Sequence, residues 1–446
     1  MNILFKRMFF VLLFLANYSF SQTNLTDEQK EWLGKVSHYE KNGWIYLHIE
    51  GKPFERGFQH GYTLAKEIYD GIRATETTWY YKTALSWNWL VETTGKIYTP
   101  KTEPEIIEEI DGIAEGVKAA GFSTSRDEIV AYNAAVELRR YWLPTKIDSL
   151  KLNLPEEKKE ACSSFIATGS MTADGGIVLG HNTMGGYYEP LCRLLIDIVP
   201  EKGHRIFMQS CAGYVHSYTD FFITDAGLVG AETTIGGFYP FDQKGTPEFS
   251  RMRKATQYAS SIEEWCEIMK TNNNGAYANA WLLGDINTNE IARLELGLRH
   301  VAFEKKKDGY FTGSNIAEDL KILRFETRTS ELDIKESSVA RRVRWKQLMK
   351  QYAGKIDIEL AEQFEADHFD AYLNKENPCG RTLCDHDEID DMMVDSGIPF
   401  SPGGTYDGKV VDSKSAKNMT FYARWGSSCG KPFYAKEFLE AHPQFD

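Results

Sequence analysis

Hydrophobic and polar positions divide the chain into a helical first third and a later part in which strands and helices alternate. From residue 53 to 140 apolar side chains recur every three or four positions, which predicts amphipathic helices. After residue 162 short runs bounded by turn residues predict strands, and helical spacing returns at 262–270, 339–352 and 358–365. This order favours an α+β layered sandwich.

The first two strands after residue 162 form a predicted hairpin. Side chains alternate in direction from 162 to 168, Asp174-Gly175-Gly176 supplies a turn, and a second strand follows at 177–179. The remaining strands are expected at 44–49, 194–199, 205–209, 221–224, 228–234, 280–285, 291–296, 299–303 and 310–312, with two more between 409 and 424.

Two glycines open the helix expected over residues 53–72. Gly57 and Gly61 are four positions apart, a spacing that suits a close contact between helices. A phosphate-binding loop would need Lys and Ser or Thr after the second glycine, so that interpretation is excluded. We interpret the aromatic residues further along as core and interhelical packing rather than a ligand cage: Trp79, Tyr80, Tyr81, Trp87 and Trp89.

The first 21 residues have the pattern of a secretory signal peptide. Lys6 and Arg7 precede the apolar run 8–16, and small residues precede an expected cut after Ser21. The run is too short to span a bilayer, and no stretch of about 18 apolar residues follows. We therefore expect a secreted or periplasmic protein without stable membrane insertion.

Composition narrows the classes of partner. The formal net charge is −13, and removal of the two basic residues with the signal peptide makes it −15, which argues against nucleic acid as a partner. With 42% hydrophobic residues the chain can bury a large core.

Seven cysteines in an exported protein leave at least one thiol unpaired if the others form disulfides, and Cys162 is the candidate. Cys379 and Cys384 are close enough in sequence for a small-loop disulfide, which the sequence leaves open. With His386 they also suggest zinc, but C-x4-C-x-H has no second ligand pair at normal spacing. We therefore expect no metal and no cofactor.

Two interpretations of Cys162 follow from its position. It is either a small buried core cysteine or a nucleophile exposed by a break of the Ala161–Cys162 bond, just after the polar connector 151–160. A chain-terminal cysteine would carry its own base, because a free α-amino group has a pKa of about 7.7–8.

Several motifs carry a family resemblance. Cys162-Ser163-Ser164-Phe165, Thr172-Ala173-Asp174-Gly175 and Gly180-His181-Asn182 resemble the penicillin acyltransferase-like N-terminal nucleophile (Ntn) hydrolases. His181-Asn182-Thr183 and Glu232-Thr233-Thr234-Ile235 resemble the related phospholipase B-like proteins. Further matches to these families lie at 57–61, 112–116, 278–285 and 404–410.

The resemblance implies a four-layer αββα sandwich activated by its own cleavage. On this basis Cys162 is the nucleophile and, through its new amino group, the base. The segments 22–161 and 162–446 stay associated as one globular unit. Asn279 matches a family asparagine that helps to form the oxyanion hole. His181 and Asn182 either orient the amino group or substrate, or have a supporting structural role.

Substrate choice is less defined. Where penicillin acyltransferase-like members commonly carry Asp, this chain has Met184, which moves it toward the phospholipase B-like pattern. Arg193 and Glu232 are the candidate substrate-binding residues, although Arg193 suits a surface ion pair equally well. We expect an amidase or acyltransferase that acts on a linear small-molecule amide. The alternatives are a hydrolase of lipid-like acyl esters, a papain-like cysteine hydrolase without chain cleavage, and an inactive binding protein.

Overall fold

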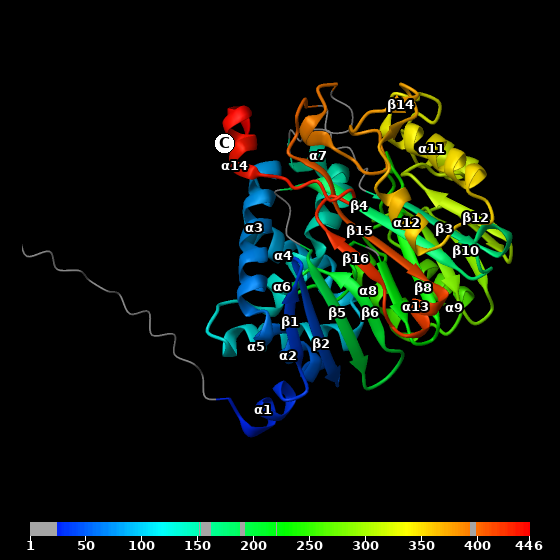
Figure 1. Ribbon diagram of the computed structural model, residues 1–446. Coiled ribbons are helices and arrows are strands. Elements are labelled where there is room, and N and C mark those ends of the chain that lie inside the picture. Colours follow the sequence, from blue (N-terminus) through cyan, green and yellow to red (C-terminus); the bar gives the residue numbers. More distant parts are fainter. Residues whose placement is uncertain (1–24, 151, 153–161, 188–191, 220, 393–397) are drawn as a thin grey trace, which may run out of the picture.

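Two β-sheets lie face to face between layers of helices (Figure 1). The computed structural model describes residues 25–150, 152, 162–187, 192–219, 221–392 and 398–446. The expected signal peptide, the connector before Cys162 and Ala161 therefore lie outside the described residues.

Among the described residues the larger sheet has nine strands, and it combines strands from the N-terminal, mostly helical part with strands from the part after Cys162. Strand β2 from the N-terminal part pairs in parallel with β5, and the other neighbouring strands are antiparallel. Its strands, in spatial order, are β1 (Ser37–Lys41), β2 (Trp44–Gly51), β5 (Leu194–Pro200), β6 (Ile206–Ser210), β7 (Phe221–Thr224), β8 (Leu228–Thr234), β9 (Asn279–Asp285), β10 (Glu290–Leu296) and β11 (Val301–Lys306).

The smaller sheet contains Cys162, which begins strand β3. All its neighbouring strands are antiparallel, and β3 lies between β12 and β4. Its strands, in spatial order, are β12 (Gly309–Gly313), β3 (Cys162–Thr168), β4 (Val178–Gly186), β15 (Gly403–Asp412) and β16 (Tyr422–Trp425). A short separate pair is formed by β13 (Phe369–Asp370) and β14 (Lys375–Glu376).

The helices form the two outer layers and several connections. Figure 1 shows α3 to α6 on one side of the sheets and α11 and α12 on the other. The α-helices are α1 (Asp27–Leu33), α2 (Pro53–Thr63), α3 (Ala65–Thr83), α4 (Trp87–Ile97), α5 (Pro104–Ala119), α6 (Arg126–Glu137), α7 (Ile147–Leu150), α8 (Glu248–Tyr258), α9 (Ile262–Lys270), α10 (Leu320–Phe325), α11 (Ser337–Gln351), α12 (Ile358–Glu365), α13 (Ser413–Lys417) and α14 (Ala435–Ala441).

Three hydrophobic clusters define the four layers. One lies between the large sheet and the N-terminal helices and includes Leu47 of β2 and Ile113 of α5. The second lies between the sheets and includes Ile166 of β3. The third joins the small sheet to α11 and α12 through Phe165 and Trp345. Because Phe165 and Ile166 are adjacent and belong to opposite faces, β3 is buried on both sides. The expected αββα sandwich is confirmed.

The glycine motif produces a close helix crossing, as its spacing predicts. A Cβ at Gly57 would lie 2.0 Å from the carbonyl oxygen of Glu109, and one at Gly61 would lie 2.1 Å from that of Ile113. Gly112 on the partner helix approaches α2 as tightly, so α2 and α5 pack backbone to backbone.

Three local expectations differ from the structure. The helix expected over 53–72 is interrupted at Leu64, between α2 and α3. Tyr80 and Tyr81 are exposed, because each helical residue turns by about 100° and Trp79 occupies the buried face. The expected strand at 177–179 is the beginning of a longer one, since β4 continues to Gly186 and includes the polar pair after Gly180.

The cysteines pair differently from the sequence-based suggestion. Cys192 and Cys211 form a disulfide, whereas Cys379 and Cys384 remain thiols. Cys192 lies two residues before β5 and Cys211 directly follows β6, so the disulfide links the ends of two neighbouring strands whose pairing the sequence did not specify.

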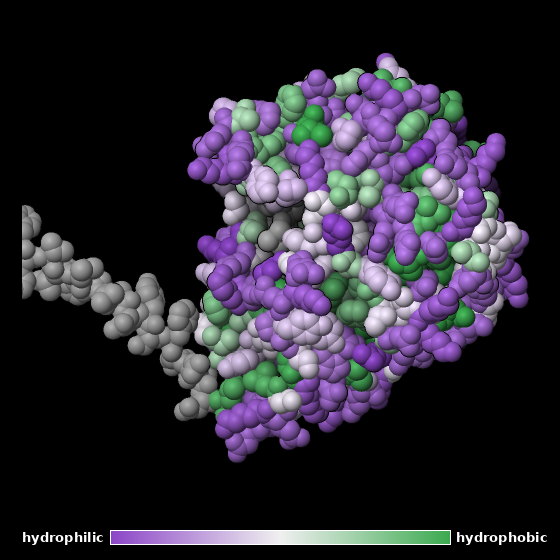
Figure 2. Space-filling model, viewed as in Figure 1, coloured by the Kyte–Doolittle hydropathy of each residue, from purple (hydrophilic) through white to green (hydrophobic). Residues whose placement is uncertain are grey.

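Hydrophilic residues dominate the visible surface of the described residues. Figure 2 shows a face that is mostly hydrophilic, with apolar residues scattered over it. Within the described residues, no helix combines the length and the hydrophobicity needed to span a bilayer.

Candidate active site

Cys162 is the first residue of β3, and its side chain is buried with 3% exposure. The Sγ atom donates to Oε1 of Glu232 on β8 over 3.7 Å. The carbonyl oxygen of Cys162 accepts a 2.6 Å hydrogen bond from Arg341 on α11. Both the thiol and the backbone of the candidate nucleophile are therefore held by long-range contacts.

Asn279 lies on the same face of the large sheet as Glu232. It pairs with Thr234 across β8 and β9, and Thr234 is two residues from Glu232, so the three side chains share a face. Asn279 is fully buried, and neither its Oδ1 nor its Nδ2 has a hydrogen-bond partner among the described residues. A buried amide without a partner is unfavourable for folding, and such groups occur where a ligand or reacting atom completes the bonding.

A chain of hydrogen bonds links Cys162 to Thr234, the residue on β8 that pairs with Asn279 on β9. The guanidinium of Arg341 that donates to the Cys162 carbonyl also donates to Oδ1 of Asn315 over 2.8 Å. The Nδ2 atom of Asn315 donates to the carbonyl oxygen of Thr234 over 2.7 Å. This network sets the position of β8 and β9, and with them Asn279, relative to the candidate nucleophile.

His181 joins the two sheets next to the site. Its Nε2 lies 3.0 Å from the carbonyl oxygen of Glu232, and because a carbonyl only accepts, Nε2 carries the proton. Burial, with a smaller contribution from the nearby Lys409 charge, holds the pKa of His181 well below its ordinary value, so the ring is neutral. The contact fixes the backbone of the residue whose carboxylate meets the Cys162 thiol.

Asn182 points to the opposite face of the small sheet. Its Nδ2 donates to the carbonyl oxygens of Glu365 and Leu383, both over 2.7 Å, and its Oδ1 accepts a 2.6 Å bond from Ser428. Through these three hydrogen bonds the Asn182 side chain connects β4 to chain segments outside the sheet. Of the two roles considered for Asn182, the geometry favours the structural one.

Arg193 is engaged elsewhere. Its guanidinium forms an ion pair with Glu40 at 3.0 Å and donates to the carbonyl oxygen of Gly43. The structure thus places Arg193 in the surface ion pair that the sequence left as an alternative, beside β1 and β2.

A buried polar cluster beside Cys162 had no role assigned from the sequence. Lys409 forms a fully buried ion pair with Asp407 and donates to Thr183 over 2.7 Å and to Gln209 over 2.6 Å. Thr183 is the residue opposite Cys162 in the β3–β4 pair. Lys409 and Asp407 lie in the family-like run 404–410, which was the available signal, whereas nothing in the sequence around Arg341 marked it.

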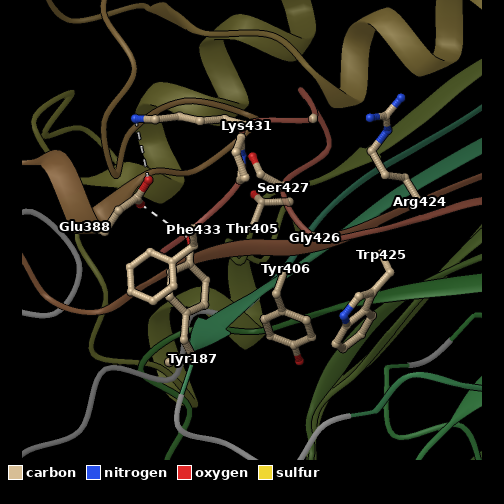
Figure 3. Close-up of a pocket in the computed structure, with 13 residues that line it drawn as sticks. Tyr187, Glu388, Thr405, Tyr406, Arg424, Trp425, Gly426, Ser427, Lys431 and Phe433 are labelled. Carbon is tan, nitrogen blue, oxygen red and sulfur yellow. Dashed lines mark hydrogen bonds and ion pairs between the residues drawn. The ribbon is translucent and has the colours of Figure 1, made fainter. Parts of the chain in front are cut away.

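A cavity of about 440 Å³ opens where β4 extends beyond the position of Cys162. Figure 3 shows the aromatic rings of Tyr187, Tyr406, Trp425 and Phe433 in its wall. Glu388 accepts from the Tyr187 hydroxyl over 3.5 Å and lies 3.9 Å from the Lys431 ammonium. The cavity therefore offers apolar ring surfaces together with charged groups.

Comparison with known proteins assigns the chain to a family. A model for the family described as Phospholipase B matches residues 37–301, which include Cys162, His181, Glu232 and Asn279. Arg341 and Lys409 lie beyond the matched range.

Individual relatives are distant. The chain is 26% identical over 257 residues to an uncharacterized protein of Archaeoglobus fulgidus, covering 52% of this chain and 40% of that protein. It is 26% identical over 249 residues to Phospholipase B of Crotalus adamanteus, covering 50% of this chain and 43% of that one. The chain thus spans less than half the length of these curated relatives.

Among solved structures, a mutant of the conjugated bile acid hydrolase from Clostridium perfringens matches with a TM-score of 0.35 and 11% identity, covering 59% of this chain and 89% of that chain. The family model, in contrast, matches on sequence and extends over more than half of the chain. The chain therefore belongs to the phospholipase B family.

Proposed function

We propose that this protein is a hydrolase that removes an acyl group from an amide or ester through a thioester on Cys162. The observation that carries the proposal is the buried, unpartnered Asn279 amide on the same sheet face as Glu232, whose carboxylate meets the Cys162 thiol. Acyl transfer through a thioester uses a thiol nucleophile and a hydrogen-bond donor for the oxyanion, and the Cys162 thiol and the Asn279 amide are candidates for these two roles. Membership of the phospholipase B family agrees with hydrolysis.

The base in this proposal is the α-amino group of Cys162 after the Ala161–Cys162 bond has broken. It takes the thiol proton while sulfur attacks the carbonyl carbon of the substrate. The Asn279 amide donates to the oxyanion, and the amino group then gives its proton to the leaving amine or alcohol. Water attacks the thioester, releases the acid and restores the thiol.

The surrounding residues have positioning roles in this scheme. Arg341 fixes the carbonyl of Cys162, so the new amino group on the same residue keeps its direction. His181 is neutral and bound to the Glu232 backbone, which suits support of the site better than proton transfer. Export by the N-terminal 21 residues remains part of the proposal.

A linear amide is the first candidate substrate, and an acyl ester is the second because the family is named for phospholipase B. The aromatic cavity beyond β4 is a suitable place for an acyl chain or an aromatic group. A panel of N-acyl amino acids, acyl ethanolamides, β-lactams and lysophospholipids distinguishes these classes of substrate.

Chain cleavage is tested on the purified secreted protein by a reducing denaturing gel and N-terminal sequencing. We expect segments 22–161 and 162–446, with the second beginning Cys162-Ser163-Ser164. Cys162→Ala should give one band, whereas the control Cys266→Ala, which removes another buried thiol, should still give two. An active wild-type protein with one full-length band would refute self-cleavage and favour a papain-like mechanism. Absence of any acylation of Cys162 would favour a binding protein.

A further inference from the structure

Four side chains from three segments of the chain meet outside the small sheet. They are His368, Cys384, His386 and Cys429, and one ligand atom from each lies within 4.8 Å of the others. Cys384 and His386 are buried, whereas His368 and Cys429 are partly buried. Both cysteines are thiols. Two thiols and two imidazoles form a donor set typical of structural zinc sites.

The distances from His386 Nε2 to the other three donor atoms are close to the edges of a tetrahedron around zinc. With Zn–S of about 2.3 Å and Zn–N of about 2.0–2.1 Å, such a tetrahedron has S–N edges of roughly 3.6 Å and N–N edges of roughly 3.3 Å. The Nε2 atom of His386 lies 3.7 Å from Sγ of Cys384, 3.5 Å from Sγ of Cys429 and 3.1 Å from Nε2 of His368.

The groups around the donors agree with a metal site. Nδ1 of His386 lies 2.8 Å from Oε1 of Glu388, which leaves Nε2 with its lone pair directed at the cluster. A carboxylate behind the second ring nitrogen is the usual support for a zinc-bound histidine. The Ser427 hydroxyl lies 3.3 Å from Sγ of Cys384 and 3.2 Å from Sγ of Cys429, within reach to donate to a thiolate.

We propose that His368, Cys384, His386 and Cys429 bind one Zn²⁺ as a closed structural site. The sequence argument against a metal considered ligands that are close along the chain, and it included Cys379. The fold instead brings in His368 from before the cysteine motif and Cys429 from after β16. Cys379 is directed elsewhere, because its Sγ contacts Asp370 at 3.6 Å.

The metal would join three segments, and two of them contact the candidate active site or its cavity. Leu383 and Ser428, each adjacent to a ligand cysteine, hold the Asn182 side chain on β4. Glu388 and Ser427, which contact the donor atoms, also line the cavity in Figure 3. Zinc is therefore expected to stiffen one wall of this cavity. The proposal does not depend on the chemistry assigned to Cys162.

The test uses the full secreted chain, purified under reducing conditions without chelator. Metal content by mass spectrometry is expected to give about one zinc per chain. Replacement by Co²⁺ is expected to give the d–d bands of a tetrahedral site together with thiolate-to-cobalt charge transfer. This spectrum is measured on the wild-type chain, so the test does not rely on the folding of any variant.

Variants identify the ligands. Cys429→Ser and His368→Ala should each lower zinc content at least tenfold and alter the cobalt spectrum, while Cys379→Ser should keep both. Removal of zinc by a chelator should lower the thermal midpoint of wild type and leave that of Cys429→Ser unchanged. The proposal is overturned if the reduced wild type binds neither ion. It is also overturned if peptide mapping of the unreduced protein shows a Cys384–Cys429 disulfide, or if Cys379→Ser loses zinc as Cys429→Ser does.

Discussion

Replacement of Asn279 by alanine separates a catalytic amide from a structural one. Both polar atoms of this buried side chain are without hydrogen-bond partners among the described residues, so alanine removes two unsatisfied groups. An unpaired buried polar group costs about 1–3 kcal/mol, which offsets the packing lost with the side chain. The free energy of unfolding should therefore change by no more than about 1 kcal/mol.

The catalytic rate of Asn279→Ala, in contrast to its stability, should fall strongly. If the Asn279 amide donates to the oxyanion, its loss removes a contact that exists only in the transition state. Removal of one such donor lowers kcat by roughly 10²–10³, or about 2.7–4 kcal/mol in the barrier. The assay is steady-state hydrolysis of a chromogenic ester or anilide of the acyl group selected from the panel.

Asn182→Ala is the matched control for stability. The same substitution there breaks three hydrogen bonds of 2.6–2.7 Å and leaves two buried carbonyl oxygens unpaired. We expect a loss of about 2–4 kcal/mol in the free energy of unfolding. Urea unfolding of both variants is measured in the Cys162→Ala background, so that each sample is a single uncleaved chain.

Alkylation of Cys162 by iodoacetamide is the matched control for reactivity. Alkylation forms no oxyanion, so Asn279→Ala should leave its rate unchanged while acylation slows. The reasoning is refuted if Asn279→Ala retains the wild-type kcat and is destabilised as strongly as Asn182→Ala.

Three further predictions concern stability. Arg341→Met should lower the free energy of unfolding by about 2–4 kcal/mol in urea titrations, because buried oxygens lose a charged donor; an unchanged midpoint would contradict this. Gly57→Ala should lower the thermal midpoint, since its Cβ would lie 2.0 Å from the Glu109 carbonyl oxygen, whereas Gly95→Ala meets no atom within 4 Å and should not. Burial raises the pKa of Glu365 well above its ordinary value, so the carboxyl stabilises the fold fully below the unfolded pKa and progressively less as pH rises. Glu365→Gln, which does not titrate there, should be more stable than wild type at pH 8, with the difference shrinking toward pH 4; the reverse order in urea titrations would contradict the assignment.

Local signals in the sequence were reliable where the structure depends on local geometry. The Asp174-Gly175-Gly176 turn predicted the β3–β4 hairpin, and the glycine spacing predicted a close helix contact of α2, although its partner, α5, was not predictable from the spacing. Residues that act through long-range contacts gave little signal. Arg341 lies 179 residues from Cys162, and a buried arginine in a helix has no pattern that distinguishes it from an exposed one.

Side-chain direction also limited the site prediction. His181 and Asn182 are neighbours in one family-like motif, and the sequence assigned them similar roles. Because β4 continues through both residues, they point to opposite faces of the sheet. The first joins β8, and the second joins the segments that carry the proposed zinc ligands. Because β4 extends through this motif, His181 lies on the side of the candidate nucleophile and Asn182 lies on the other side.

A new chain end at Cys162 would remain fixed, because its strand is held independently of the residue before it. Strand β3 pairs with β12 on one side and β4 on the other, and its outer face receives a 2.8 Å hydrogen bond from Trp345 to Ser163. Arg341 holds the Cys162 carbonyl from the same helix. The N-terminal part would remain attached as well, since β2 pairs with β5 and its helices share the largest core cluster. An amino group freed on Cys162 would therefore have the fixed position that a catalytic base requires.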